Sequence, residues 1–130
     1  MKVRISSALL DAIRAHAAEE PDWEVCGLLL GVPGQISGAR RAANVSPSPA
    51  DSFEIDPAAL FAAIRAERAG GPKLLGHYHS HPSGGAEPSE RDVMMARDVG
   101  RLWLILGNGE ERLWLVAEPG RFETVHALIE

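Results

Sequence analysis

Hydrophobic and polar positions follow two different periods along this chain. Apolar residues recur every four positions at Leu9, Ile13 and Ala17, which predicts a helix with one buried face. The run Val25–Val32 is almost entirely apolar and predicts a strand that is buried on both faces. Because helical and extended patterns mix throughout, we expect an α/β fold with a central mixed sheet flanked by helices.

Capping and turn residues delimit the other elements. Asp56-Pro57 predicts a helix start, since aspartate caps the helix and proline suits its first position. A third helix is predicted from Ser89, and Asn108-Gly109 is typical of a tight hairpin turn. Extended patterns predict strands over residues 2–5, 39–45, 73–79, 101–106, 112–117 and 122–127.

Composition limits the size of the protein and the kinds of partner. With 130 residues, of which 45% are hydrophobic, the chain has the size and apolar content of one domain, over residues 1–130. The net charge of −5 argues against nucleic acid, which attracts a clustered basic surface. A single cysteine, Cys26, cannot form an internal disulfide, which favours the cytoplasm.

The sequence carries no sign of a membrane segment. No apolar run approaches the roughly 18 residues that cross a bilayer. Asp11 and Arg14 interrupt the apolar patch near the N-terminus before it resembles a signal peptide. We therefore expect a cytoplasmic protein without a membrane partner, and the sequence indicates no particular oligomeric state.

Histidines concentrate in one short segment of the chain. His77, His79 and His81 alternate over five residues, although the whole sequence has only five histidines. Alternate positions of a strand face the same way, so neighbouring imidazoles in this pattern can converge on one metal ion. A lone histidine is more often structural, but this density next to proline and glycine turns favours a metal site.

A carboxylate follows at the start of the third predicted helix. Ser89 and Asp92 have the spacing of a capping box, and that structural role is compatible with a functional one. The exposed N–H groups of a helix start suit an anion, and Asp92 is placed to supply a third ligand. Two histidines, one carboxylate and an open position are typical of a catalytic zinc site.

A zinc hydrolase of this kind also needs a carboxylate that transfers protons to and from water. Glu24, directly before the apolar run, is the best candidate. From the residues alone, however, an ordinary surface glutamate at the entry to a strand is the simpler interpretation.

These residues resemble a known family. His79-Ser80-His81-Pro82, followed after six residues by Ser89 and after two more by Asp92, is similar to the signature of the JAMM/MPN (Mov34/PAD) zinc metalloproteases. The segment 21–31 resembles the place where that family has its catalytic glutamate.

The resemblance implies a fold like that of cytidine deaminases and one Zn²⁺ per chain, bound by His79, His81 and Asp92. It implies that Glu24 acts as general acid and base through the metal-bound water, and that Ser89 stabilises the tetrahedral oxyanion. The reaction implied is hydrolysis of the amide or isopeptide bond after the C-terminal glycine of a ubiquitin-like protein. Since the chain leaves little room for insertions, it resembles the short bacterial members, which act on small sulfur-carrier or ubiquitin-like proteins with a Gly-Gly tail.

Other classes of protein compete with this interpretation. A non-catalytic MPN scaffold is the main alternative, although such scaffolds typically lack part of the metal signature. A nucleobase deaminase would need a Pro-Cys-x-x-Cys string that the sequence lacks, and the acidic balance argues against a DNA-associated relative. We expect His77 to support a ligand rather than to be one, Cys26 to be inert, and Trp103, Trp114, His16 and His126 to be structural.

Overall fold

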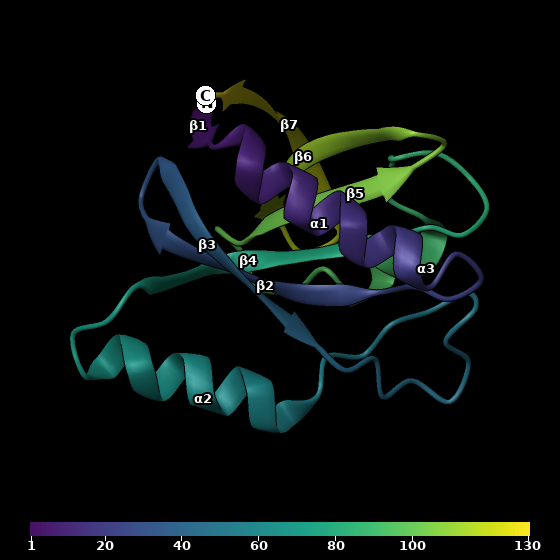
Figure 1. Ribbon diagram of the computed structural model, residues 1–130, viewed down its shortest axis with the longest axis horizontal. Coiled ribbons are helices and arrows are strands. Elements are labelled where there is room, and N and C mark those ends of the chain that lie inside the picture. Colours follow the sequence, from purple (N-terminus) through teal and green to yellow (C-terminus); the bar gives the residue numbers. More distant parts are fainter.

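The computed structural model describes residues 1–130 as seven strands and three helices (Figure 1). In chain order these are β1 (Lys2–Ile5), α1 (Ser7–Glu19), β2 (Cys26–Val32), β3 (Gln35–Ala42), α2 (Pro57–Arg68), β4 (Lys73–Ser80), α3 (Glu90–Met95), β5 (Leu102–Gly107), β6 (Glu110–Glu118) and β7 (Arg121–Ile129).

The strands form one mixed sheet, as the sequence predicts. Strand β2 pairs antiparallel with β3 and β4, β4 runs parallel to β5, and β5, β6 and β7 are antiparallel. Strand β1 pairs in parallel with both β3 and β7, so the sheet closes on itself. The sequence did not predict this closure, because the partners of β1 lie far away along the chain.

Local signals place most of the elements correctly. The Ser6 side chain caps α1 by accepting from Leu9 N, and Asp56 caps α2. The β5–β6 turn has positive φ at Asn108 and Gly109, as an Asn-Gly hairpin requires. The predicted bounds of the third strand, residues 39–45, are wrong. The turn at Gly34 lets the strand begin at Gln35, and it ends at Ala42.

Alternate residues of the central strands enter different parts of the core. Leu29 of β2 packs with Leu10 and Ile13 of α1, whereas Leu28 packs with Ala63 of α2. Figure 1 shows α1 and α2 on opposite sides of β2 and β4. The predicted burial of β2 on both faces is confirmed, and the neighbouring strand β4 has the same two-sided cover.

None of the three helices combines the length and the apolar character that spanning a bilayer demands.

Candidate metal centre

The two faces of β4 differ in chemistry because side chains alternate along a strand. Tyr78 points into the core beneath α1, where its hydroxyl lies 2.6 Å from Nδ1 of His16. His77 and His79 lie on the opposite face, with ring centroids 5.9 Å apart, and both contact Phe53. The predicted shared face of these two histidines is confirmed.

The ring of His79 is buried against aromatic side chains, and its Nε2 faces Asp92 and His81. Its side chain is 0% exposed, and the Phe53 ring stacks on it with centroids 4.2 Å apart and planes 21° apart. Trp103 contacts it edge-on at 5.6 Å. Burial lowers the pKa of His79, which keeps the imidazole neutral and therefore able to bind a metal.

His81 follows the end of β4 and is fixed by hydrogen bonds instead. Its backbone N–H donates to Leu106 O at 2.7 Å, and its Nδ1 lies 2.7 Å from Gly85 O. Because a carbonyl oxygen only accepts, Nδ1 carries a proton, so that Nε2 keeps its lone pair whenever the ring is neutral. Burial by itself would lower the pKa of His81, but the bonds to Asp92 and Gly85 outweigh it and raise that pKa.

Asp92 joins the two histidines to the start of α3. Its Oδ2 lies 3.2 Å from His79 Nε2 and 3.0 Å from His81 Nε2, and it accepts from Ser89 N at 2.9 Å. The carboxyl is buried, which opposes its charge, but the hydrogen bonds from both histidines and from Ser89 lower its pKa. The predicted capping box is confirmed, since Ser89 Oγ also accepts from Asp92 N.

These three ligand atoms fit a zinc ion. His79 Nε2 and His81 Nε2 are 3.2 Å apart, so the triangle that they form with Asp92 Oδ2 has sides of 3.2, 3.2 and 3.0 Å. A tetrahedral zinc with bonds of about 2.0–2.1 Å separates its ligand atoms by about 3.3–3.4 Å. When both Nε2 atoms carry lone pairs, they and the carboxylate repel one another at this spacing unless a cation lies among them.

Glu24 completes the cluster from the entry to β2. Its backbone N–H donates to Pro49 O at 2.7 Å, and its carbonyl accepts from Asn44 Nδ2 at 2.8 Å. A ligand oxygen of Glu24 and the nitrogens of His79 and His81 all lie within 4.8 Å of one another. Asp92 Oδ2 lies 3.0–3.2 Å from both histidine nitrogens, which favours Asp92 over Glu24 as the third ligand.

The Glu24 carboxyl is buried yet unsatisfied. The residue is 6% exposed, and Oε1 has no hydrogen-bond partner. Burial raises the pKa of Glu24 to about 7, against the opposing effect of His81. The simpler interpretation of Glu24 as a surface residue is therefore wrong: the loop that leads into a buried strand is itself covered by the segment around Pro49.

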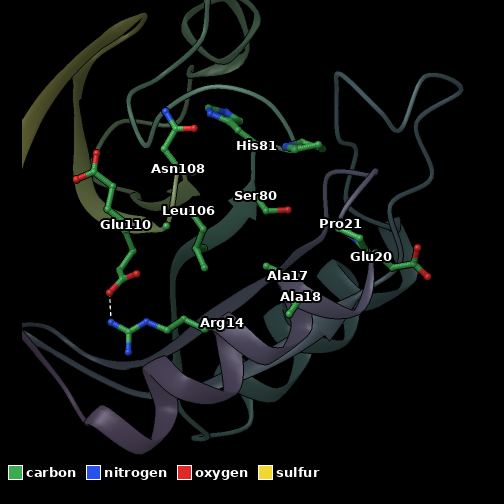
Figure 2. A pocket seen from close by; sticks show the side chains of 14 residues that line it. Arg14, Ala17, Ala18, Glu20, Pro21, Ser80, His81, Leu106, Asn108 and Glu110 are labelled. Carbon is green, nitrogen blue, oxygen red and sulfur yellow. Dashed lines mark hydrogen bonds and ion pairs between the residues drawn. The ribbon is translucent and has the colours of Figure 1, made fainter.

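Two clefts meet at His81. One, of about 330 Å³, is lined by Glu24, Asp51, Ser89 and the loop that follows His81. Since Ser89 Oγ accepts from Asp92 N, its own O–H remains available to donate into this cleft. Figure 2 shows the second cleft, of about 380 Å³, which extends from His81 between α1 and the β5–β6 turn.

The remaining candidate residues lie outside the cluster. His77 is not among the converging ligand atoms, and burial lowers its pKa to about 3, so it is neutral. Cys26 is 0% exposed, and burial raises the pKa of its thiol to about 12. Trp103 is buried in the core as predicted, whereas Trp114 is only half-buried and donates from Nε1 to Ala86 O at 3.0 Å.

Sequence reasoning missed Phe53 and Gly85, which support His79 and His81. Phe53 lies in a short extended piece far from the histidines in sequence, and Gly85 supplies only a backbone carbonyl. The glycines of the turn after Pro82 were the available signal for Gly85, whereas no local pattern pointed to Phe53.

Residues 6–117 match the Prok-JAB family, described as prokaryotic homologs of the JAB domain. The chain belongs to this family, and the resemblance to the JAMM/MPN proteins is confirmed.

Two relatives and one solved structure illustrate the similarity. The chain is 40% identical over 93 residues to a probable TtuB-protein conjugate cleaving protease of Thermus thermophilus, a match that covers 72% of this chain but 62% of that protein, less than two thirds of its length. It is 31% identical over 110 residues to the desampylase of Haloferax volcanii, covering 80% and 79% of the two chains. The solution structure of protein DSY2949 from Desulfitobacterium hafniense has a TM-score of 0.84 at 25% identity and covers 100% of this chain and 93% of the other.

Proposed function

We propose that this protein is a zinc-dependent peptidase that hydrolyses the amide bond after the C-terminal glycine of a ubiquitin-like or sulfur-carrier protein. One observation carries the proposal: three ligand atoms lie 3.0–3.2 Å apart, next to a buried glutamate without a hydrogen-bond partner. The relatives support the substrate class, since one is named for the cleavage of TtuB-protein conjugates and the other is named a desampylase.

His79, His81 and Asp92 would hold the zinc in this proposal. Bound zinc polarises a carbonyl and lowers the pKa of water to roughly 7. Glu24 takes the proton of the attacking water and delivers it to the amine that leaves. Burial raises the pKa of Glu24, which makes this carboxylate a stronger base than an exposed glutamate and therefore better suited to accept and pass on a proton.

Ser89 contributes to the same step from the helix start. Its hydroxyl lines the cleft beside Glu24 and has a free proton to donate. We propose that it donates to the substrate carbonyl oxygen as negative charge develops there. A donor placed in advance stabilises that charge without reorganising, which is the source of its catalytic effect.

The two clefts give the substrate room on both sides of the bond to be cleaved. Glycine at the end of a tail adds no side chain that would have to fit beside His81 and Glu24 in the cleft. We propose a Gly-Gly tail on the carrier for this reason.

The broader setting follows from the composition and the fold. We propose a single peptidase domain over residues 1–130 with a fold like that of cytidine deaminases, acting in the cytoplasm without nucleic-acid or membrane partners. The buried free thiol of Cys26 suits a reducing compartment, and the net charge of −5 disfavours polyanions.

Cleavage of defined carrier adducts tests the proposal. The zinc-loaded protein is incubated with a Gly-Gly carrier joined to cysteine, to a lysine side chain, or to a peptide extension, and the products are identified by intact mass. We expect release of a carrier that ends in glycine from at least one adduct, with no release by Glu24→Gln or Asp92→Ala. Stoichiometric zinc without cleavage of any adduct would replace the peptidase by the MPN scaffold.

A further inference from the structure

The loop between His81 and α3, residues 82–88, has no regular structure of its own. It contains neither helix nor strand, and no backbone-to-backbone hydrogen bond involves any of its residues. Nevertheless the Gly85 carbonyl of this loop lies 2.7 Å from His81 Nδ1 and determines which ring nitrogen faces Asp92. Contacts from outside the loop must therefore hold that carbonyl in place.

The first of these contacts comes from Gly107, the last residue of β5. A Cβ atom at this position would lie 2.4 Å from Gly85 O and 2.7 Å from Gly84 O, well inside the 3.0 Å that real Cβ atoms keep. Only a glycine allows the backbone of the loop to rest on the end of β5. The preceding residue, Leu106, accepts the His81 N–H, so adjacent residues of β5 support both the backbone and the ring of His81.

The second contact comes from Trp114 on β6. Its indole Nε1 donates to Ala86 O at 3.0 Å, and Ala86 is 0% exposed. The carbonyls of Gly85 and Ala86 thus have separate partners, one in the His81 ring and one in the hairpin. Since β5 pairs with β6 along its whole length, including the part of β6 that carries Trp114, the two contacts belong to one unit.

We propose that the β5–β6 hairpin positions the zinc ligand His81 through Gly107 and Trp114, although neither residue reaches the metal. The inference rests on the zinc site of the proposed function. A loop displaced by about 1 Å no longer offers its carbonyl to His81, and the loss of such a partner typically weakens metal binding about 10- to 100-fold. His79 meets the hairpin through Trp103 and through the pairing of β4 with β5, and not through the loop that carries Gly85.

Gly107→Ala tests the proposal, with Gly38→Ala as the matched control. Gly38 lies on β3, where an added Cβ would meet nothing closer than 4.0 Å. Zinc affinity is measured by competition with a chelating indicator, and the melting temperature of the zinc-free protein is measured separately. We expect Gly107→Ala to bind zinc at least about tenfold more weakly and Gly38→Ala to bind it like wild type.

Trp114→Phe provides a second test that does not strain the backbone. It keeps an aromatic ring but removes the donor to Ala86 together with part of the indole, and Phe122→Leu, in the same aromatic cluster, controls for lost packing. We expect weaker zinc binding in Trp114→Phe than in Phe122→Leu. In the zinc-free state, ¹⁵N NMR of His81 should show the proton on Nδ1 in wild type and a mixture of tautomers in Gly107→Ala and Trp114→Phe.

The outcomes separate this inference from the proposed function. If folded Gly107→Ala binds zinc as tightly as wild type, the role of the hairpin is overturned and the zinc site is left intact. If Gly107→Ala does not fold, the same result in Trp114→Phe has the same meaning. Failure of the wild-type protein itself to bind zinc overturns the proposed function, and the inference with it.

Discussion

His79 and His81 are two residues apart and approach the same carboxylate, but the protein supports them by different means. His79 lies on a paired strand, 0% exposed, with Phe53 stacked on its ring. His81 lies in a loop, with its backbone bonded to Leu106 and its ring to Gly85. One imidazole is held mainly by packing and the other by hydrogen bonds, and Asp92 contacts both.

The two kinds of support have opposite electrostatic effects. Burial among apolar rings lowers the pKa of His79, whereas the bonds of His81 to Asp92 and Gly85 raise its pKa. Packing at the end of β4 therefore fixes the position of the His79 ring. The hydrogen bond from His81 Nδ1 to the Gly85 carbonyl fixes both the position and the tautomer of the His81 ring. Substitutions that remove one support at a time should show how much each contributes.

The largest effect is expected from Asp92→Ala, which removes the atom that both histidines share. Loss of an indirect partner typically weakens zinc binding about 10- to 100-fold, so loss of a direct ligand should exceed about 100-fold. Competition with a chelating indicator measures this, and Glu90→Ala on the same helix, an exposed position, serves as the control. Retention of tight zinc binding in Asp92→Ala would remove Asp92 from the ligand set.

Glu24→Gln should separate chemistry from metal binding. The variant keeps the shape of the side chain but cannot take up a proton, so cleavage should fall by about 10²- to 10⁴-fold. Zinc affinity should stay within about threefold, because the three ligands at 3.0–3.2 Å do not include this carboxylate. Glu54→Gln, on the exposed surface, is the control; loss of zinc in Glu24→Gln would instead make Glu24 a ligand.

Phe53→Ala should weaken the support of His79 and leave that of His81 unchanged. Removing a half-buried aromatic ring is expected to lower the free energy of unfolding by about 2 kcal/mol, below the 3–5 kcal/mol of a fully buried one. Zinc affinity should fall about tenfold, as for other indirect partners. Urea titration and zinc competition measure the two effects, and Phe53→Leu should lie between wild type and Phe53→Ala. If zinc affinity did not change, packing on the ring would not contribute to binding.

The smallest effect is expected at Cys26, which pairs across the sheet with His79. Because burial raises the pKa of its thiol to about 12, Cys26 stays protonated at pH 8 and should react with iodoacetamide far more slowly in the native protein than in urea. Mass spectrometry of the alkylated protein measures both rates. Cys26→Ala should retain cleavage within about twofold, and a large loss would contradict the assignment of Cys26 as a structural residue.

Short-range signals in the sequence determined much of this protein. The spacing of Leu9, Ile13 and Ala17 predicted α1, and Asn108-Gly109 predicted the hairpin. Both signals lie between residues that are close together in the sequence. Alternation of the histidines predicted their common face, because the period of a strand is two residues. The capping box of Ser89 and Asp92 was predicted for the same reason, as its bonds span only three residues.

Contacts between distant parts of the chain were decided by the tertiary structure alone. The burial of Glu24 depends on the segment around Pro49, the closure of the sheet on β1 meeting β7, and the support of His81 on Gly107. None of these has a local signature, because each depends on which surfaces meet after the core has formed. The proposed ligand residues could be selected from the sequence, whereas the tautomer, burial and spacing that suit them to a metal result from long-range packing.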